Sequence, residues 1–145
     1  MSPVVLNGET RLIPIVGDPI AQVKSPGALT RILAERGHNA IVYPAHVAAG
    51  DLPLFLAAAK ATRNLDGIVI TVPHTIAALD ACDEPTARAR FLGSVNVLHR
   101  RADGVWTGDA TGGLGYLDGC RRHGFDVAGK RALLVGAGGA GSAVA

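Results

Sequence analysis

Near the end of the chain, a glycine-rich turn has the residue types and spacing of a phosphate-binding site: Gly136-Ala137-Gly138-Gly139-Ala140-Gly141. It follows the apolar segment Arg131–Val135, which predicts a buried strand, and it precedes a predicted helix. In such a G-x-G-x-x-G turn, Gly136 permits the tight turn, Gly138 lets a pyrophosphate approach the backbone, and Gly141 lets the helix pack on the strand. The helix N-terminus adds free N–H groups and partial positive charge. The pattern favours a nicotinamide dinucleotide as ligand; a glycine-rich turn without a cofactor is the alternative.

The chain ends at Ala145, before the acidic or basic residue that reads the ribose of such a cofactor. The residues present therefore fit NADP and NAD equally.

Three polar segments lie upstream, each at the carboxyl end of a predicted strand or in the loop that follows it. They are Val16-Gly17-Asp18-Pro19-Ile20-Ala21-Gln22-Val23-Lys24-Ser25-Pro26, Ile70-Thr71-Val72-Pro73-His74 and Gly93-Ser94-Val95-Asn96. Open α/β sheets bind their ligands at that edge, so these segments, which include Ser25, Thr71 and Asn96, are where a ligand is expected. The alternatives are structural, because Ser25 can cap a helix and Thr71 is a common strand residue.

The elements that must position these residues alternate between short apolar runs and helical patterns. Strands are predicted at Arg11–Val16, Ala40–Tyr43 and Gly67–Val72, the last of which is apolar on both faces, as in a parallel sheet covered by helices. One helix is predicted after Ser25, as its cap, and another after Asp51. This alternation predicts an α/β fold with a mostly parallel sheet covered by helices.

The second half of the chain adds a hairpin and ends in the glycine-rich turn. The predicted elements are a short helix from Pro85 to Gly93, hairpin strands at Val95–Arg100 and Val105–Thr107, and a helix at Thr111–His123. The polar stretch Gly124–Lys130 is the best candidate for a domain boundary. We expect the strand, turn and helix after it to be the start of a Rossmann-type nucleotide-binding domain.

The composition is that of a globular protein and excludes several kinds of partner. The 145 residues are 48% hydrophobic and 18% charged, with a net charge of +2. Basic residues are scattered and aromatic residues make up 4%, so we expect no nucleic-acid partner. No apolar run approaches the ~18 residues of a membrane span, and no signal pattern is present, which favours a cytoplasmic protein without a membrane partner. Cys82 and Cys120 lack metal-ligand spacing, so we expect buried free thiols and no metal site.

Taken in order, the three polar segments, Gly108-Asp109 and the glycine-rich turn resemble the shikimate dehydrogenase family, from about Leu12 to Ala145. The resemblance implies a substrate-binding α/β domain, here residues 1–124, followed by the truncated start of a Rossmann domain, residues 125–145. It places the chemistry in the cleft between them, with Ser25, Thr71 and Asn96 at substrate-contacting positions. The family reduces 3-dehydroshikimate to shikimate with NADPH, and some members use quinate or NAD. Its chains are longer than this one, so we expect residues 1–145 alone to hold a dinucleotide poorly.

The chain departs from the family at the positions that carry the chemistry. The family's catalytic lysine is the last residue of the motif V-P-[FH]-K, and the corresponding residue here is Thr75. The family's catalytic aspartate is the fifth residue of the motif G-D-N-T-D-G, and the corresponding residue here is Gly112. The asparagine of that second motif is Ala110 here, and one of two substrate-contacting serines is Val23. A threonine hydroxyl does not titrate near neutral pH, and a positioned acid–base group contributes about 10²–10⁴-fold to rate. No catalytic residue of the family is retained, and we expect feeble or absent turnover of shikimate.

His74 and Asp109 are the ionisable residues nearest in sequence to the two changed positions. The family carries a histidine and an aspartate there beside intact catalytic residues. We therefore interpret His74 as structural or supporting, and Asp109 as non-catalytic.

The leading hypothesis is an oxidoreductase that uses NADP, or NAD, to interconvert a 3-dehydroshikimate/shikimate-type cyclic hydroxy acid, diverged in substrate or weak on shikimate. The alternative is a non-catalytic ligand-binding or regulatory homologue. A more general likeness to two-domain nicotinamide enzymes, such as methylenetetrahydrofolate dehydrogenases, explains the glycine-rich turn but not the three polar segments. The family resemblance implies a monomer or homodimer acting on a small molecule in aromatic amino acid biosynthesis.

Overall fold

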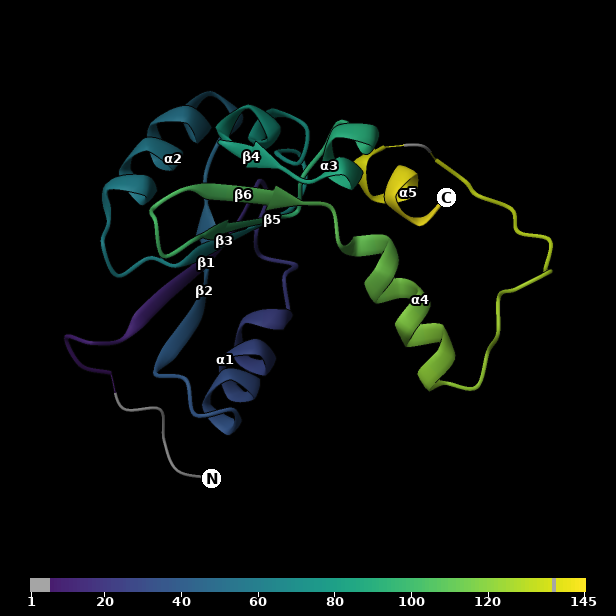
Figure 1. Ribbon diagram of the computed structural model, residues 1–145, viewed down its shortest axis with the longest axis horizontal. Coiled ribbons are helices and arrows are strands. Elements are labelled where there is room, and N and C mark those ends of the chain that lie inside the picture. Colours follow the sequence, from purple (N-terminus) through teal and green to yellow (C-terminus); the bar gives the residue numbers. More distant parts are fainter. Residues whose placement is uncertain (1–5, 137) are drawn as a thin grey trace.

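The computed structural model describes residues 6–136 and 138–145, and within them the strands form one six-stranded sheet in the order β2-β1-β3-β5-β6-β4. The strands are β1 Arg11–Gly17, β2 Ala40–His46, β3 Gly67–Ile70, β4 Glu84–Pro85, β5 Val97–Arg100 and β6 Trp106–Asp109. The helices are α1 Ser25–Glu35, α2 Leu52–Ala61, α3 Ala87–Leu92, α4 Gly112–Arg122 and α5 Gly139–Val144, with short 3-10 turns η1 Ala49–Asp51 and η2 Ala77–Ala81. Figure 1 shows α2 and α3 on one side of the sheet, α1 on the other, and α4 and α5 beyond one end.

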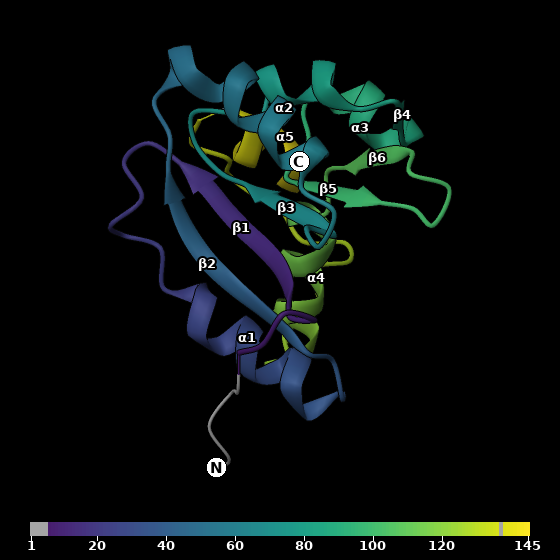
Figure 2. The same ribbon diagram turned by 90° about the vertical axis from the view of Figure 1, so that its left-hand side faces the viewer.

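The first three strands form the parallel part of the sheet that the sequence predicts. β1 pairs with β2 along its whole length and with β3 through Ile15 opposite Val69 and Val16 opposite Ile70, both in parallel (Figure 2). β4 also runs parallel to β6, whereas the β3–β5 and β5–β6 pairs are antiparallel. The α/β class is therefore confirmed, and the sheet is mixed. The antiparallel part includes the predicted hairpin, which turns at Gly104 with a φ of +86°.

The core lies between the sheet and the helices on the α2 side. Leu52 and Leu56 of α2 belong to one buried cluster with Ile68, Ile70 and Leu98 of the strands. Burying a side chain of this size contributes about 1.5–3 kcal/mol. These side chains hold β3 and β5 in place, and with them the loops that leave and enter those strands.

Arg100 ties the end of α2 to the sheet. Its guanidinium lies over the Trp106 ring, 4.9 Å from the ring centroid, and donates to the carbonyl oxygens of Ala59, Lys60 and Thr62 at 2.8–3.2 Å. These carbonyls lie at the carboxyl end of the helix, where a cation is favoured.

Two of the predicted helix caps do not form. α1 begins at Ser25 itself, with Lys24 at the N-cap position, so the prediction of Ser25 as cap is wrong. Asp51 does occupy the N-cap position of α2, but its side chain makes no capping hydrogen bond. A capping side chain reaches the first helical N–H groups from an extended backbone. Lys24 and Asp51 already have helical backbone angles, which removes that geometry.

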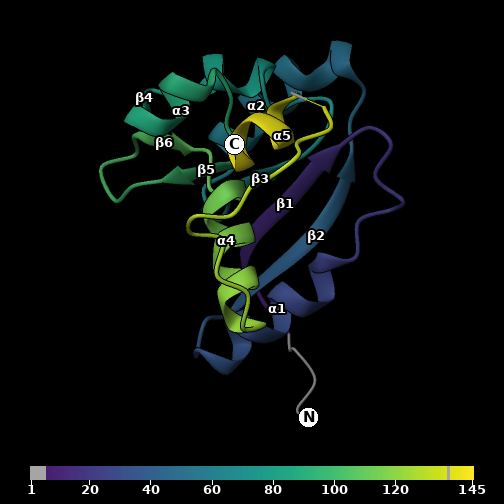
Figure 3. The same cartoon turned by 90° about the vertical axis from the view of Figure 1, so that its right-hand side faces the viewer.

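The predicted strand at Arg131–Val135 is wrong. These residues belong to no strand, and Leu133 and Val135 are 91% and 89% exposed. A strand forms by exchanging backbone hydrogen bonds with a neighbour, and none of the described strands pairs with this segment. It leads from the end of α4 to α5, which lies against α4 (Figure 3).

Both cysteines are free and half-buried, less enclosed than the predicted buried thiols. Burial raises the pKa of the Cys82 thiol, the largest effect on that group. No helix in the described residues is both long enough and apolar enough to span a membrane.

Candidate functional site

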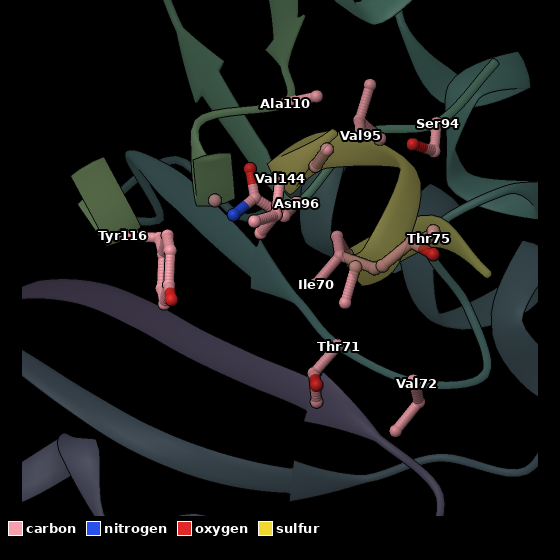
Figure 4. Close-up of a pocket in the computed structure, with 14 residues that line it drawn as sticks. Ile70, Thr71, Val72, Thr75, Ser94, Val95, Asn96, Ala110, Tyr116 and Val144 are labelled. Atoms are coloured by element: carbon pink, nitrogen blue, oxygen red, sulfur yellow. The ribbon is translucent and has the colours of Figure 1, made fainter. Parts of the chain in front are cut away.

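A cavity of about 340 Å³ lies beside the carboxyl end of β3 (Figure 4). Its walls come from the loop after β3, the loop before β5, the end of β6, the start of α4, and α5. The residues that line it are Ile70, Thr71, Val72, Thr75, Ser94, Val95, Asn96, Ala110, Gly112, Tyr116, Gly139, Ala140, Ala143 and Val144. The volume is at the small end of the range for ligand pockets, roughly 300–1,000 Å³.

Main-chain hydrogen bonds join the walls of the cavity. The Ile70 N–H donates to the Asn96 carbonyl at 2.8 Å, and the Val95 N–H donates to the Thr75 carbonyl at 2.8 Å. The Asn96 N–H donates to the Asp109 carbonyl at 2.9 Å. Backbone hydrogen bonds therefore join the loop after β3, the loop before β5 and the end of β6.

Two of the three predicted substrate contacts line this cavity. Thr71 comes from the end of β3 and Asn96 from the start of β5. The Asn96 Oδ1 accepts hydrogen bonds from the Thr111 N–H at 2.8 Å and the Thr111 hydroxyl at 3.2 Å. This orients the amide so that its Nδ2 donor faces Gly112. Ser25 is exposed at the start of α1 and is not among the lining residues.

The two positions where the resemblance places catalytic residues also line the cavity. At Gly112, an ideal Cβ would lie 3.7 Å from Asn96 Nδ2 and 4.0 Å from Ala143 Cβ, which are ordinary contacts. At Gly139, an ideal Cβ would lie only 2.5 Å from Thr75 Oγ1. Position 112 therefore has room for a side chain, whereas Thr75 lies directly against the backbone of the glycine-rich turn.

The glycine-rich turn has the backbone features that its sequence predicts. Gly136 has a φ of +98°, which favours glycine, and the Cβ direction of Gly138 is open within 4 Å. An ideal Cβ on Gly141 would lie 2.4 Å from the Gly136 carbonyl oxygen. The close approach that requires Gly141 is therefore to the turn itself, because no strand precedes it. Gly139 and Ala140 line the cavity, and Ala137 lies outside the described residues.

His74 has a structural place, as expected. It is 2% exposed, and its Nε2 lies 2.7 Å from the carbonyl oxygen of Val47, just after β2. The ring joins the loop after β3 to the segment that follows β2, two strands away in the sheet, and does not line the cavity.

Asp109 is held by an ion pair. Its carboxylate accepts hydrogen bonds from Arg88, from the Thr86 hydroxyl at 2.7 Å and from the Ala110 N–H at 2.8 Å. Burial raises the pKa of the Asp109 carboxyl, but the hydrogen bonds from Arg88, Thr86 and Ala110 outweigh it and lower that pKa below its usual value. Asp109 thus fastens β6 to α3 as a permanently ionised carboxylate at neutral pH.

The sequence patterns did not single out two residues of the cavity. Tyr116 of α4 lines it one helical turn beyond Gly112. Ser94 lies beside Asn96 and is 3% exposed. Ser94 could have been predicted from its place two residues before Asn96, the predicted substrate contact. Tyr116 could have been predicted only from its position one helical turn after residue 112.

The cavity offers hydrogen bonds and no charge. None of its lining residues within the described chain is Asp, Glu, Lys, Arg or His. In the same part of the chain, no group of three or more His, Cys, Asp or Glu could hold a metal ion. The arrangement can bind an uncharged hydroxylated or carbonyl-containing group through Thr71, Thr75, Ser94 and Asn96.

Comparison with known proteins agrees with this architecture. A family model described as the shikimate dehydrogenase substrate binding domain matches residues 15–98. Shikimate dehydrogenase (NADP(+)) of Stenotrophomonas maltophilia strain R551-3 is 42% identical over 132 residues, which are 90% of this chain and 46% of that protein.

Two solved structures share the fold along nearly the whole chain. Shikimate 5-dehydrogenase of Listeria monocytogenes, in complex with shikimate and NAD, is 29% identical with a TM-score of 0.86, covering 96% of this chain and 47% of that one. Ligand-free 5-ketofructose reductase of Gluconobacter sp. strain CHM43 is 29% identical with a TM-score of 0.81, covering 95% and 49%.

The chain thus spans about half the length of the relatives it matches. The matched segment begins near the end of β1 and includes β2, β3, the loop that carries Thr71 and Thr75, and the Ser94–Asn96 segment. On this match, and on the sheet and cavity that accompany it, the chain belongs to the shikimate dehydrogenase family.

Proposed function

We propose that this chain provides the substrate site and phosphate-binding turn of an NADP-dependent oxidoreductase of the shikimate dehydrogenase type. The reaction is the interconversion of an alcohol and a ketone on a shikimate-type cyclic hydroxy acid, with weak activity on shikimate itself. The observation that carries this proposal is that one cavity brings Thr71 and Asn96 together with Gly139 and Ala140 of the glycine-rich turn.

The turn suits a dinucleotide phosphate. The positive φ of Gly136 and the open Cβ direction of Gly138 leave the backbone accessible, and Gly141 keeps the turn tight. When bound, NADP supplies or accepts the hydride. The residues of this chain hold the substrate against the turn, and the Asn96 Nδ2 and Thr71 hydroxyl orient its hydroxyl groups.

The weak activity on shikimate follows from the uncharged lining. Neither Thr75 nor Gly112 can exchange a proton near neutral pH, and acid–base assistance contributes about 10²–10⁴-fold. The relative from Gluconobacter is named as a reductase of 5-ketofructose, which supports the view that this fold serves more than one ketone substrate.

We also propose that the substrate domain comprises residues 1–124 and the nucleotide domain begins at residue 125. The end of α4 at Arg122 and the positive φ of Gly124 support this division.

The test is an absorbance assay of NADPH formation by the protein at its full natural length, with shikimate and quinate as substrates. The Stenotrophomonas enzyme, assayed beside it, serves as the reference. We expect measurable turnover with shikimate that is about 10²–10⁴-fold slower than the reference rate. Turnover of shikimate at the reference rate would contradict the interpretation of Thr75 and Gly112.

The double variant Thr75→Lys with Gly112→Asp sharpens this test. An aspartate fits at position 112, where an added Cβ makes ordinary contacts, and it begins helix α4, where an acidic residue is favoured. The lysine must bend away from Gly139, because Thr75 Oγ1 already lies close to that backbone. We expect the double variant to gain shikimate turnover, and Gly112→Asp alone to gain none.

A non-catalytic homologue is the other outcome that the assay can reveal. Binding of shikimate or NADP by calorimetry, without turnover by the wild type or the double variant, would replace the enzymatic proposal with a ligand-binding one.

A further inference from the structure

Ser94 is a largely buried residue whose hydroxyl makes no hydrogen bond within the part of the chain that the structure describes. Among the described residues, three polar ones are less than one tenth exposed: Thr10, His74 and Ser94. The Thr10 hydroxyl donates to Asn39 Oδ1 at 3.0 Å, and His74 Nε2 lies 2.7 Å from the Val47 carbonyl oxygen. The Ser94 hydroxyl has no hydrogen bond to another described residue. The hydroxyl can therefore both donate to and accept from a molecule that is not part of the protein.

The Ser94 hydroxyl is open to the cavity. Among the described residues, one fully enclosed side-chain nitrogen or oxygen lacks a hydrogen bond, and it is Arg100 Nε. The Ser94 oxygen also lacks one, so it is not fully enclosed by protein. Ser94 lines the cavity, and Figure 4 shows its oxygen directed toward the inside. A ligand in the cavity can therefore reach this hydroxyl.

A second hydroxyl lies beside it. The Val95 N–H donates to the Thr75 carbonyl at 2.8 Å and holds the two loops together. An ideal Cβ on Gly139 would lie 2.5 Å from Thr75 Oγ1 and 3.9 Å from Ser94 Cβ, so both residues flank the first residue of α5. Thr75 and Ser94 thus occupy the part of the cavity that meets the glycine-rich turn.

We infer that Ser94 is a substrate-contacting residue, whose hydroxyl, together with that of Thr75, bonds the oxygen on the carbon that changes between alcohol and ketone. The inference rests on the proposed function, because the reacting carbon must face the turn that holds the cofactor. A serine hydroxyl both donates and accepts. It can donate to the carbonyl oxygen of the ketone and accept from the hydroxyl of the alcohol, so it serves both forms without changing its own charge.

The experiment compares Ser94→Ala with a matched hydroxyl deletion outside the cavity, Thr107→Val, in the full-length protein. Thr107 lies on the hairpin, and its hydroxyl donates to the His99 carbonyl at 3.3 Å. Calorimetric titration with shikimate and quinate, with NADP present, gives the affinities, and the absorbance assay gives kcat and KM. We expect Ser94→Ala to weaken binding of a probe or lower kcat/KM by about three- to tenfold. Thr107→Val should leave both unchanged.

Thermal unfolding without ligand separates substrate contact from a structural role. Because the Ser94 hydroxyl makes no hydrogen bond to the described residues, the Tm of the Ser94→Ala variant should stay at the wild-type value or rise. Wild-type affinity and kcat/KM in Ser94→Ala would overturn the inference, as would a change confined to the KM for NADP or a loss of affinity that merely follows a fall in Tm. A wild-type protein that neither binds nor converts either probe would instead overturn the proposed function on which the inference rests.

Discussion

The sheet region, residues 11–110, and the glycine-rich region, residues 111–145, are positioned by opposite means. In the first, apolar side chains such as Leu52, Ile68 and Leu98 are almost completely buried in one cluster. In the second, α5 lies against α4 where side chains are absent: an ideal Cβ on Gly113 would meet the Ala143 carbonyl oxygen at 1.7 Å. The first region is stabilised by buried apolar side chains, and in the second the close approach of the α4 and α5 backbones sets the position of α5. The cavity lies where the two meet.

The largest expected difference between the regions is in leucine truncation. Leu98→Ala removes a side chain that is 1% exposed in the middle of the sheet, and we expect it to lower the free energy of unfolding by about 2–5 kcal/mol. Leu133→Ala removes one that is 91% exposed, and its effect should stay within about 0.5 kcal/mol. Urea denaturation of the two variants measures both values. Equal losses would show that Leu133 is buried in the protein in solution, and the contrast between the regions would fail.

In the second region, stability should depend on where a glycine gains a side chain and not on where an apolar side chain is lost. Gly113→Ala places a methyl group where the Ala143 carbonyl lies, so α5 must move away, at a cost of about 1–3 kcal/mol. Gly119→Ala, in the same helix with open space around its Cβ, should stabilise the protein by up to about 1 kcal/mol through better helix propensity. Thermal unfolding gives the sign for each variant, and limited proteolysis after α4 reports whether α5 has moved. Similar behaviour of the two variants would mean that α5 does not dock on Gly113.

A smaller effect concerns the pH dependence of the ion pair that joins α3 to the end of β6. The pKa of Asp109 is lowered in the folded protein, so the folded state favours the ionised carboxylate. The resulting stability is present above the unfolded value of about 3.9 and is lost as the pH falls through the folded pKa.

Asp109→Asn should therefore be less stable than the wild type at neutral pH and should lose less stability between about pH 5 and pH 2. Asp66 and Asp83, whose pKa values are also lowered, keep some pH dependence in both proteins. Urea denaturation across this pH range measures the slopes. Parallel slopes would show that Asp109 is not held by Arg88 in solution.

These two regions also differ in how well the sequence predicts them. The strands at Arg11 and Gly67 and the hairpin around Gly104 follow from apolar runs and turn residues, which act locally. The direction of β3 relative to β5 does not, because the apolar pattern of β3 reports burial on both faces, and β3 pairs in parallel with β1 on one side and antiparallel with β5 on the other. The strand expected at Arg131–Val135 failed for the same kind of reason. Its residues have the right pattern, but a strand also needs a partner, which local sequence does not reveal.

The candidate site shows the same limit. Thr71 and Asn96 follow from their places at strand ends and from the family resemblance, and the structure brings them into one cavity. Ser94 does not stand out in the sequence, because a serine in a loop is usually exposed and its burial without a partner is a property of the packed structure. The proximity of Thr75 to Gly139, 64 positions later in the chain, likewise depends on how α5 docks.

The main-chain bonds around the cavity have a consequence for how this site can change. Because Ile70, Val95 and Asn96 join the walls through backbone N–H groups, these bonds do not depend on the side chains at positions 71, 75, 94 and 112. Residues at positions 71, 75, 94 and 112 can be exchanged with little effect on the loops that display them. The side chains that face the cavity can therefore be changed while the backbone that carries them stays in place, which suits this site to redesign toward new ketones.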